Sequence, residues 1–156
     1  MERGGSMSNY SERKLQQALH QAGFYTQKAP SSGHGILDEE TEEYIDQADI
    51  VAIKRITITE EDANGNVVDR SLPVVLIIEE KHRKPPTCQI LDEEKHQLER
   101  IEEITGAEAY VAVSWKNYQG GHQFFRIQDL VDTGQHWKIT QEMNGMVLED
   151  GTLQRQ

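Results

Sequence analysis

The chain has 156 residues and a formal net charge of −11, with 16 Lys and Arg against 27 Asp and Glu. This length favours one domain with a real core. The acidic balance argues against a protein coated in positive charge for non-specific DNA binding, but it leaves room for a local basic patch. The single cysteine, Cys88, excludes an internal disulfide, and no apolar segment is long enough to cross a bilayer. We therefore expect a cytoplasmic protein with no membrane partner.

The first third of the chain predicts one helix and one short strand. Residues 1–10 are expected to be a flexible leader, and Ser11 can cap a helix that runs to about Ala22. Residues 24–29 follow as a strand. Residues 31–47 are polar, include the acidic segment 38–46, and are expected to form a mobile loop.

The middle of the chain predicts a hairpin and a central strand. A strand from Asp49 to about Thr59 leads into an inserted hairpin near residues 57–70, whose turn is Asn64-Gly65-Asn66. A separate central strand is expected from Leu72 or Pro73 to about Lys81, because its uninterrupted aliphatic run is typical of a strand covered on both faces.

The second half predicts a parallel crossover and a less regular end. Asp92 is a plausible N-cap for a helix through Thr105, and strands are expected at 109–115 and 122–127. The core domain would cover residues 11–130. Residues 131–156 would form a C-terminal extension, with a small hairpin of 137–139 and 146–148 around Asn144-Gly145.

The stretch from Val74 to Lys81 carries the chemistry. Five apolar residues lead into Glu79-Glu80-Lys81, and strand alternation places Glu79 and Lys81 on one face with Glu80 on the other. With Asp49 on a neighbouring strand, this set offers two acidic oxygen ligands for a hard cation and a lysine beside them. We expect Asp49, Glu79 and the backbone carbonyl of Glu80 to bind Mg²⁺, for which Mn²⁺ would substitute.

Several pieces of the sequence, taken in order, resemble the archaeal-type Holliday junction resolvases of the PD-(D/E)XK nuclease superfamily. The pieces are Glu12 in the first helix, Gly23-Phe24, Ala29-Pro30-Ser31-Ser32-Gly33, Ala48-Asp49-Ile50-Val51, Ile78-Glu79-x-Lys81, Leu91-Asp92-Glu93-Glu94 and Phe124-Phe125-Arg126-Ile127-Gln128-Asp129-Leu130. The resemblance spans roughly residues 11–130. It implies an α/β, single-domain restriction-endonuclease-like fold, with a mixed central β-sheet flanked by helices.

The resemblance also implies the activity and the roles of individual residues. The expected enzyme is a Mg²⁺-dependent endodeoxyribonuclease that works as a homodimer and cuts opposed strands of a four-way DNA junction. Asp49, Glu79 and Lys81 would be its catalytic core, Glu12 an additional metal contact, and Ser32 a loop serine that helps to place the scissile phosphate.

Basic and polar residues near this site are expected to contact DNA phosphates. They are Lys28, Ser31, Ser32, His82, Arg83 and Lys84. Three departures bear on the substrate, because the loop after Ser32 is acidic, the 57–70 hairpin is inserted, and the tail after Leu130 is longer than the family needs.

Other interpretations stay open from the sequence alone. Glu79 and Lys81 could form a surface ion pair worth about 0–1 kcal/mol. Glu12 could merely complement a helix dipole, and Ser32 could merely shape a turn. Two other functions also remain, namely a same-fold nuclease that acts on other branched, damaged or foreign DNA, and a non-catalytic binding module.

Overall fold

A computed structural model of the chain describes residues 7–28, 36–38, 43–45, 48–118 and 120–155. Its centre is a seven-stranded sheet in the order β1-β4-β5-β7-β8-β11-β12. Its strands are β1 (Tyr25–Lys28), β4 (Ile50–Glu61), β5 (Val67–Arg83), β7 (Glu108–Trp115), β8 (Gln123–Arg126), β11 (Met146–Glu149) and β12 (Thr152–Arg155). The sheet is mixed, since β5 and β7 are parallel and the other pairs are antiparallel.

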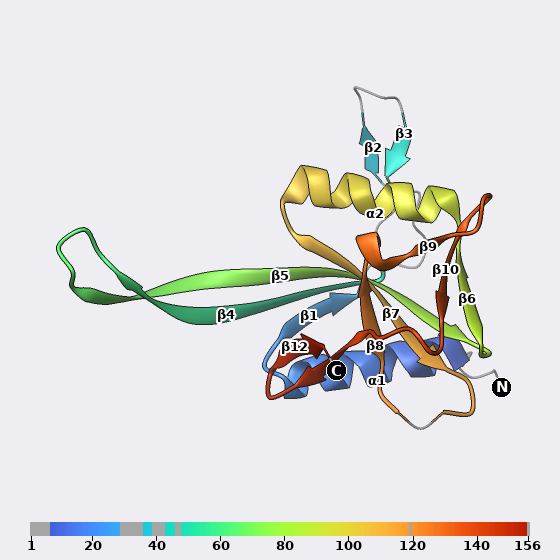
Figure 1. Cartoon of the computed structure of the whole chain (residues 1–156), viewed down its shortest axis with the longest axis horizontal. Coiled ribbons are helices and arrows are strands. Elements are labelled where there is room, and N and C mark those ends of the chain that lie inside the picture. Colours follow the sequence, from blue (N-terminus) through green and yellow to red (C-terminus); the bar gives the residue numbers. More distant parts are fainter. Residues whose placement is uncertain (1–6, 29–35, 39–42, 46–47, 119, 156) are drawn as a thin grey trace.

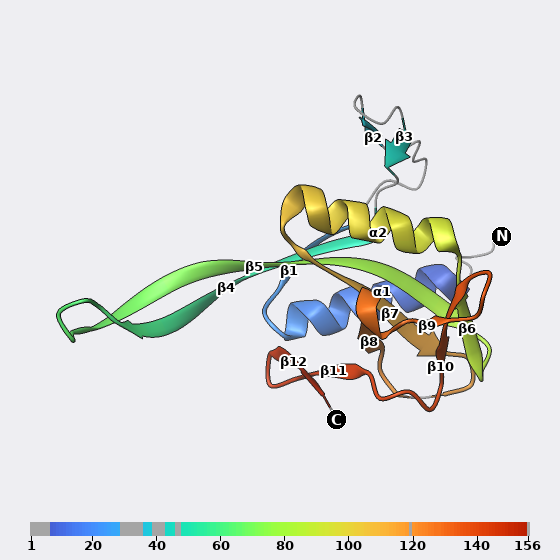
Figure 2. The ribbon, with the colours of Figure 1, turned by 45° about the horizontal axis from the view of Figure 1, so that its top comes forward.

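Two helices cover opposite faces of this sheet (Figure 2). α1 (Met7–Gln21) packs Leu15 and Leu19 against one face, and α2 (Asp92–Thr105) packs Leu98 against the other. The mixed α/β fold, and the parallel crossover from β5 through α2 to β7, are therefore as predicted. The remaining elements are a short 3-10 helix and two small sheets. The helix is η1 (Ile127–Asp129). One sheet has the order β6-β10-β9, with β6 (Thr87–Ile90), β10 (Trp137–Thr140) and β9 (Val131–Asp132), and the other pairs β2 (Ile36–Asp38) with β3 (Glu43–Ile45).

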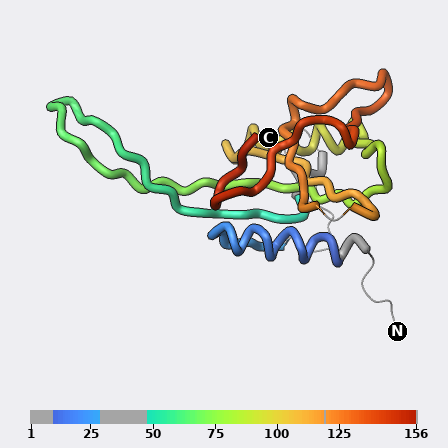
Figure 3. The backbone as a smooth tube through the Cα atoms, turned by 60° about the horizontal axis from the view of Figure 1, so that its bottom comes forward, coloured from blue at the N-terminus to red at the C-terminus, as the bar shows by residue number. Residues whose placement is uncertain are grey.

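The inserted hairpin projects from the body as a two-stranded ribbon (Figures 1 and 3). The return strand and the central strand, which the sequence predicted as two elements, form the single 17-residue strand β5. Asp62 closes the turn through its Oδ1, which accepts the amides of Asn64 and Asn66 at 2.9 Å each. Gly65 has a φ of +80°, a conformation that glycine tolerates best, so the predicted Asn-Gly turn is confirmed.

The helix boundaries correct two details. α1 begins at Met7, so residues 7–10 are helical and not a leader, and Ser11 lies inside the helix as a buried residue, not as its cap. α2 begins at Asp92 with Leu91 as its N-cap, and the Leu91 amide donates to Glu94 Oε1 at 2.9 Å. Gly106 ends α2 with a φ of +72°, as its sequence position predicted.

The loop and the tail also differ from expectation. The described parts of segment 31–47 form the antiparallel pair β2-β3, whereas a structureless loop was predicted. The predicted pairing of 137–139 with 146–148 is wrong, because β10 pairs with β6 and β9, and β11 pairs with β8 and β12. The Asn-Gly signal is local, whereas β6 and β8, which lie earlier in the chain, bring β10 and β11 into two different sheets. The segment after residue 130 is thus built into both larger sheets.

Candidate active site at the end of β5

Asp49, Glu79 and Lys81 come together where β4 begins. Ile50 pairs with Ile78, so Asp49, one residue earlier, continues this register to Glu79. The backbone amide of Glu80 donates to Asp49 Oδ2 at 2.8 Å, and Lys81 Nζ lies 3.9 Å from Glu79 Oε2. The antiparallel pairing of two buried strands therefore produces the cluster that the sequence predicted.

The two carboxylates of this cluster are hard to ionise together. Burial, together with the nearby charge of Asp49, raises the pKa of Glu79 to about 8. Burial also raises the pKa of Asp49, and the charges of Glu12 and Glu80 act in the same direction. Lys81 opposes both shifts without cancelling them. Both carboxyls thus hold their protons more tightly than usual, in the kind of environment that marks functional residues.

Glu94 is a site residue that sequence reasoning missed. Its Oε2 contacts Lys81 Nζ, while its Oε1 accepts the Leu91 amide at 2.9 Å. The first turn of α2 therefore also holds the lysine. The sequence signal was the position of Glu94, three residues after the N-cap, which is typical of a capping box. Its contact with Lys81 depends on how α2 packs on the sheet.

Glu12 lies close enough to this cluster to raise the pKa of Asp49. Its Oε2 is 3.0 Å from Lys28 Nζ, at the end of β1, yet this buried oxygen makes no hydrogen bond of good geometry with the described residues. Lys28, a predicted DNA contact, is therefore near the cluster and pairs with a candidate metal ligand. Its charge partly offsets that of Glu12.

The residues present fit a hard divalent cation. Two carboxylates with raised pKa values and a buried carboxylate oxygen without a hydrogen bond would all gain from a nearby positive charge. Among the described residues, no three His, Cys, Asp or Glu side chains form a group that could hold a metal by themselves. Such a cation would therefore need backbone oxygens, water or a substrate phosphate as further ligands, as Mg²⁺ commonly does.

The side chain of Glu80 belongs to the opposite face of β5, as strand alternation predicted. It is 2% exposed, accepts from Ser11 Oγ and lies 2.9 Å from His122 Nε2. Ser11 Oγ also lies 2.6 Å from Ser114 Oγ, which is 2.8 Å from His82 Nδ1. Only the backbone of Glu80 faces Asp49, so its carboxylate is occupied elsewhere. Sequence reasoning missed this network.

The other predicted contacts lie around this end of the sheet or outside the described residues. His82, Arg83 and the exposed Lys84 continue from Lys81, and Arg83 donates to the His82 carbonyl at 2.9 Å. Ser31 and Ser32 lie outside the described residues, so their predicted roles stay predictions.

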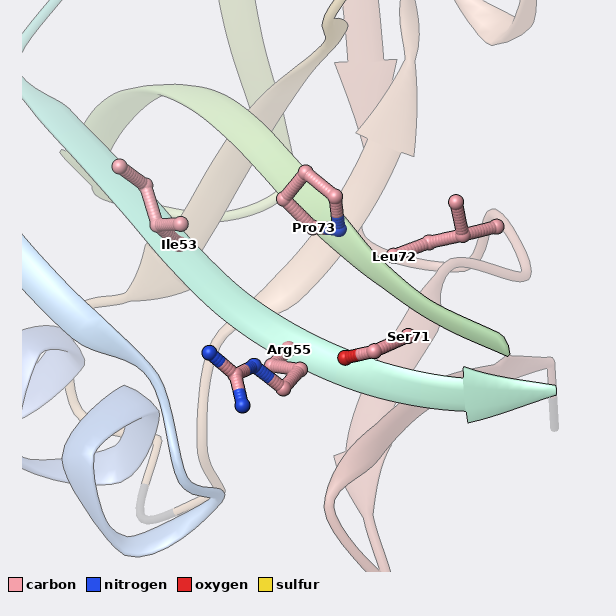
Figure 4. Close-up of a pocket in the computed structure, with 5 residues that line it drawn as sticks. All are labelled: Ile53, Arg55, Ser71, Leu72 and Pro73. Carbon is pink, nitrogen blue, oxygen red and sulfur yellow. The ribbon is translucent and has the colours of Figure 1, made fainter. Parts of the chain in front are cut away.

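A shallow hollow of about 590 Å³ lies elsewhere, at the root of the hairpin. Figure 4 shows Ile53 and Arg55 from β4 and Ser71, Leu72 and Pro73 from β5 at its edge. The hollow contains no carboxylate or histidine. Its β5 residues lie at least six positions from Glu79, which is roughly 20 Å at strand spacing. Its nearest β4 residue, Ile53, pairs with Val75, four positions from Glu79. This hollow therefore carries none of the chemistry discussed above.

Comparisons with known proteins agree with this picture. The family model described as archaeal Holliday junction resolvase (Hjc) matches residues 62–156. The match includes Glu79 and Lys81 and the tail that sequence reasoning set apart as an extension, but it does not reach Asp49. A solved structure of Hjc from Archaeoglobus fulgidus, described as a Holliday junction resolvase from an archaeal hyperthermophile, is 28% identical. It aligns over 86% of this chain and 84% of that chain, with a TM-score of 0.60. No curated protein matches the chain. Within the described residues, no helix is long and apolar enough to span a membrane.

Proposed function

This chain belongs to the archaeal Holliday junction resolvase (Hjc) family, and we propose that it is a Mg²⁺-dependent endonuclease that resolves four-way DNA junctions through Asp49, Glu79 and Lys81. Dependence on a divalent metal is general for resolvases of this family, and the choice of Mg²⁺ is our proposal. A single observation supports the site best, namely that two carboxylates with raised pKa values and one buried lysine meet at one strand end.

Asp49 and Glu79 would hold the metal, with Glu12 as an additional contact. When bound, a divalent cation polarises a phosphate oxygen and lowers the pKa of an attacking water. The Glu80 amide fixes the orientation of Asp49, so the ligand is positioned before the metal arrives.

Lys81 would contribute its positive charge at the scissile phosphate. Its side chain is 9% exposed and is held by Glu79 and Glu94, so little reorganisation is needed when negative charge develops on the phosphate. Electrostatic stabilisation would be its main role, with orientation of the attacking water as a second one.

The protein would act as a homodimer on branched DNA. Resolving a junction requires two cuts in opposed strands, and one cluster per chain supplies one cut. Phosphate contacts would come from the surrounding polar and basic residues, which are Lys28, Ser31, Ser32, His82, Arg83 and Lys84. The molar mass in solution, measured by light scattering with and without junction DNA, tests the dimer.

The decisive experiment compares three DNA substrates. Wild-type protein is incubated with a synthetic four-way junction, a linear duplex and a flap in the presence of Mg²⁺, Mn²⁺ or a chelator. We expect paired cuts in the junction alone, and none with the chelator. Equal cleavage of the flap would favour a nuclease for other branched DNA, and wild-type cleavage rates in both Glu79→Gln and Lys81→Ala would refute the site.

A further inference from the structure

A second cavity, of about 220 Å³, lies on the α1 face at the ends of β5 and β7. It is smaller than the roughly 300–1,000 Å³ of typical small-molecule sites, so it suits one ring system and not a larger ligand. Its walls come from α1, which supplies Tyr10 and Lys14, and from the segment after β7, which supplies Asn117 and Tyr118.

The two tyrosines give the cavity an aromatic lining that faces solvent. Tyr10 is 53% exposed and Tyr118 is 56% exposed. Tyr118 lies against the backbone of Gly120, where an added Cβ would come within 2.1 Å of the ring, so the glycine permits this placement. Lys14 Nζ lies 5.7 Å from the centre of the Tyr10 ring and adds a positive charge at the same wall.

The floor of the cavity is polar and leads directly to the catalytic strand. Ser11, Ser114 and His122 line it, and both Ser11 and His122 bond the buried Glu80 carboxylate. His82 lines it too, and its Nε2 is buried without a hydrogen-bond partner among the described residues. Glu80 is flanked in the chain by Glu79 and Lys81, so the cavity and the proposed active site lie on the two faces of one strand end.

We propose that this cavity receives one nucleotide extruded from its pair at the branch point of a DNA junction, with its base stacked on the tyrosines and its phosphate near Lys14. Aromatic stacking combined with a cation is how proteins bind unpaired nucleotides without reading their sequence. A base inside a continuous duplex must lose two stacking neighbours to be extruded, whereas a base at an open branch point has already lost one, so the cavity would add affinity for branched DNA and not for duplex. This inference rests on the proposed function for the identity of the ligand.

Binding measurements in a chelator, where no cleavage occurs, test the proposal. Fluorescence anisotropy would give the Kd of a four-way junction and of a matched duplex for the wild type, Tyr10→Ala, Tyr118→Ala and Tyr118→Phe. Tyr25→Ala is the matched control, because Tyr25 is similarly exposed but lies on β1, away from the cavity. We expect each alanine variant at the cavity to weaken junction binding about tenfold. The Kd for the duplex should stay within twofold of the wild-type value in every variant. The Kd of Tyr118→Phe and of Tyr25→Ala for the junction should also stay within twofold of the wild-type value.

A second measurement locates the nucleotide. With 2-aminopurine at the branch point, the wild type should change the fluorescence of the probe and Tyr118→Ala should not. The inference would be overturned if Tyr10→Ala and Tyr118→Ala both bound the junction within twofold of the wild-type affinity. It would also be overturned if they lost affinity equally for the junction and the duplex. If the wild type cleaves junctions while the tyrosine variants bind normally, only this inference fails. If the wild type neither prefers nor cleaves junctions, the proposed function fails first.

Discussion

The two faces of the β5 end hold buried carboxylates with different partners. On the α2 face, burial is the largest cause of the raised pKa values of Asp49 and Glu79, and the charge of Asp49 raises that of Glu79 further. On the α1 face, Glu80 is more deeply buried than Glu79, yet Ser11 and His122 both bond its carboxylate. We therefore interpret Glu80 as structural, because side chains satisfy its carboxylate, and Asp49 and Glu79 as the candidate site, because their pKa values are raised.

The largest expected effect comes from substitutions on the α2 face, which should affect cleavage and not stability. Glu79→Gln and Lys81→Ala should each reduce single-turnover junction cleavage by about a thousandfold, since the first removes a proposed metal ligand and the second a proposed positive charge at the scissile phosphate. Glu79→Gln should leave the thermal unfolding midpoint unchanged or higher, because it removes a carboxyl whose pKa is raised by burial and by the charge of Asp49. A large fall in that midpoint would mean that Glu79 is structural.

Substitution of Glu80 on the α1 face should instead lower the stability of the fold. Glu80→Ala leaves Ser11 and His122 without their acceptor, so we expect it to lower the free energy of unfolding by about 3 kcal/mol. Urea titration measures this loss. Glu80→Gln retains an acceptor oxygen and should lose less, and equal losses in both variants would contradict the role assigned to these hydrogen bonds.

The raised pKa of Glu79 predicts how metal binding depends on pH. Metal must displace a proton from Glu79 below pH 8, so affinity should rise up to tenfold per pH unit towards about pH 8 and then level off. Calorimetric titration with Mn²⁺ in buffers of different ionisation enthalpy would detect the released proton. The same curve in Glu79→Gln would assign the proton to another group.

Without metal, the same group should make stability fall as pH rises. The carboxyl holds its proton more tightly in the folded protein, at a pKa of about 8, than in the unfolded chain, near 4.5. The contribution of Glu79 to the free energy of unfolding therefore falls as the pH rises from about 4.5 to about 8, and it is constant above pH 8. Urea titrations at several pH values should show a steeper decline in the wild type than in Glu79→Gln.

The smallest expected effect comes from removing the contact between Glu94 and Lys81. Glu94→Gln keeps an oxygen for the Leu91 amide but removes the negative charge beside Lys81, and should slow cleavage by about three- to tenfold. Glu93→Gln, an exposed acid in the same first turn, is the matched control and should cleave like the wild type. Equal rates in both variants would remove Glu94 from the site.

Local patterns predicted the strands that build the site, and distant contacts explain what they missed. The aliphatic run before Glu79 and the alternation after it were sufficient to separate Glu79 and Lys81 from Glu80. Ser11 was misread as a helix cap, because a serine before an apolar stripe has the same local pattern whether or not a buried glutamate lies opposite. The contact between Glu94 and Lys81 depends likewise on the docking of α2, which no short window of sequence contains.

Because β5 is continuous, the length of the hairpin can change without changing the pairing at the Glu79 end of the strand. One strand runs from the hairpin tip at Val67 to Arg83, and its register with β4 is unbroken from Glu61 and Val67 to Ile50 and Ile78. Matched residues added or removed at the tip, one in each strand, leave every pairing nearer the body unchanged. Relatives should therefore tolerate wide variation in hairpin length, whereas a single unmatched residue in β5 between the hairpin and Glu79 would turn the acid towards the wrong helix.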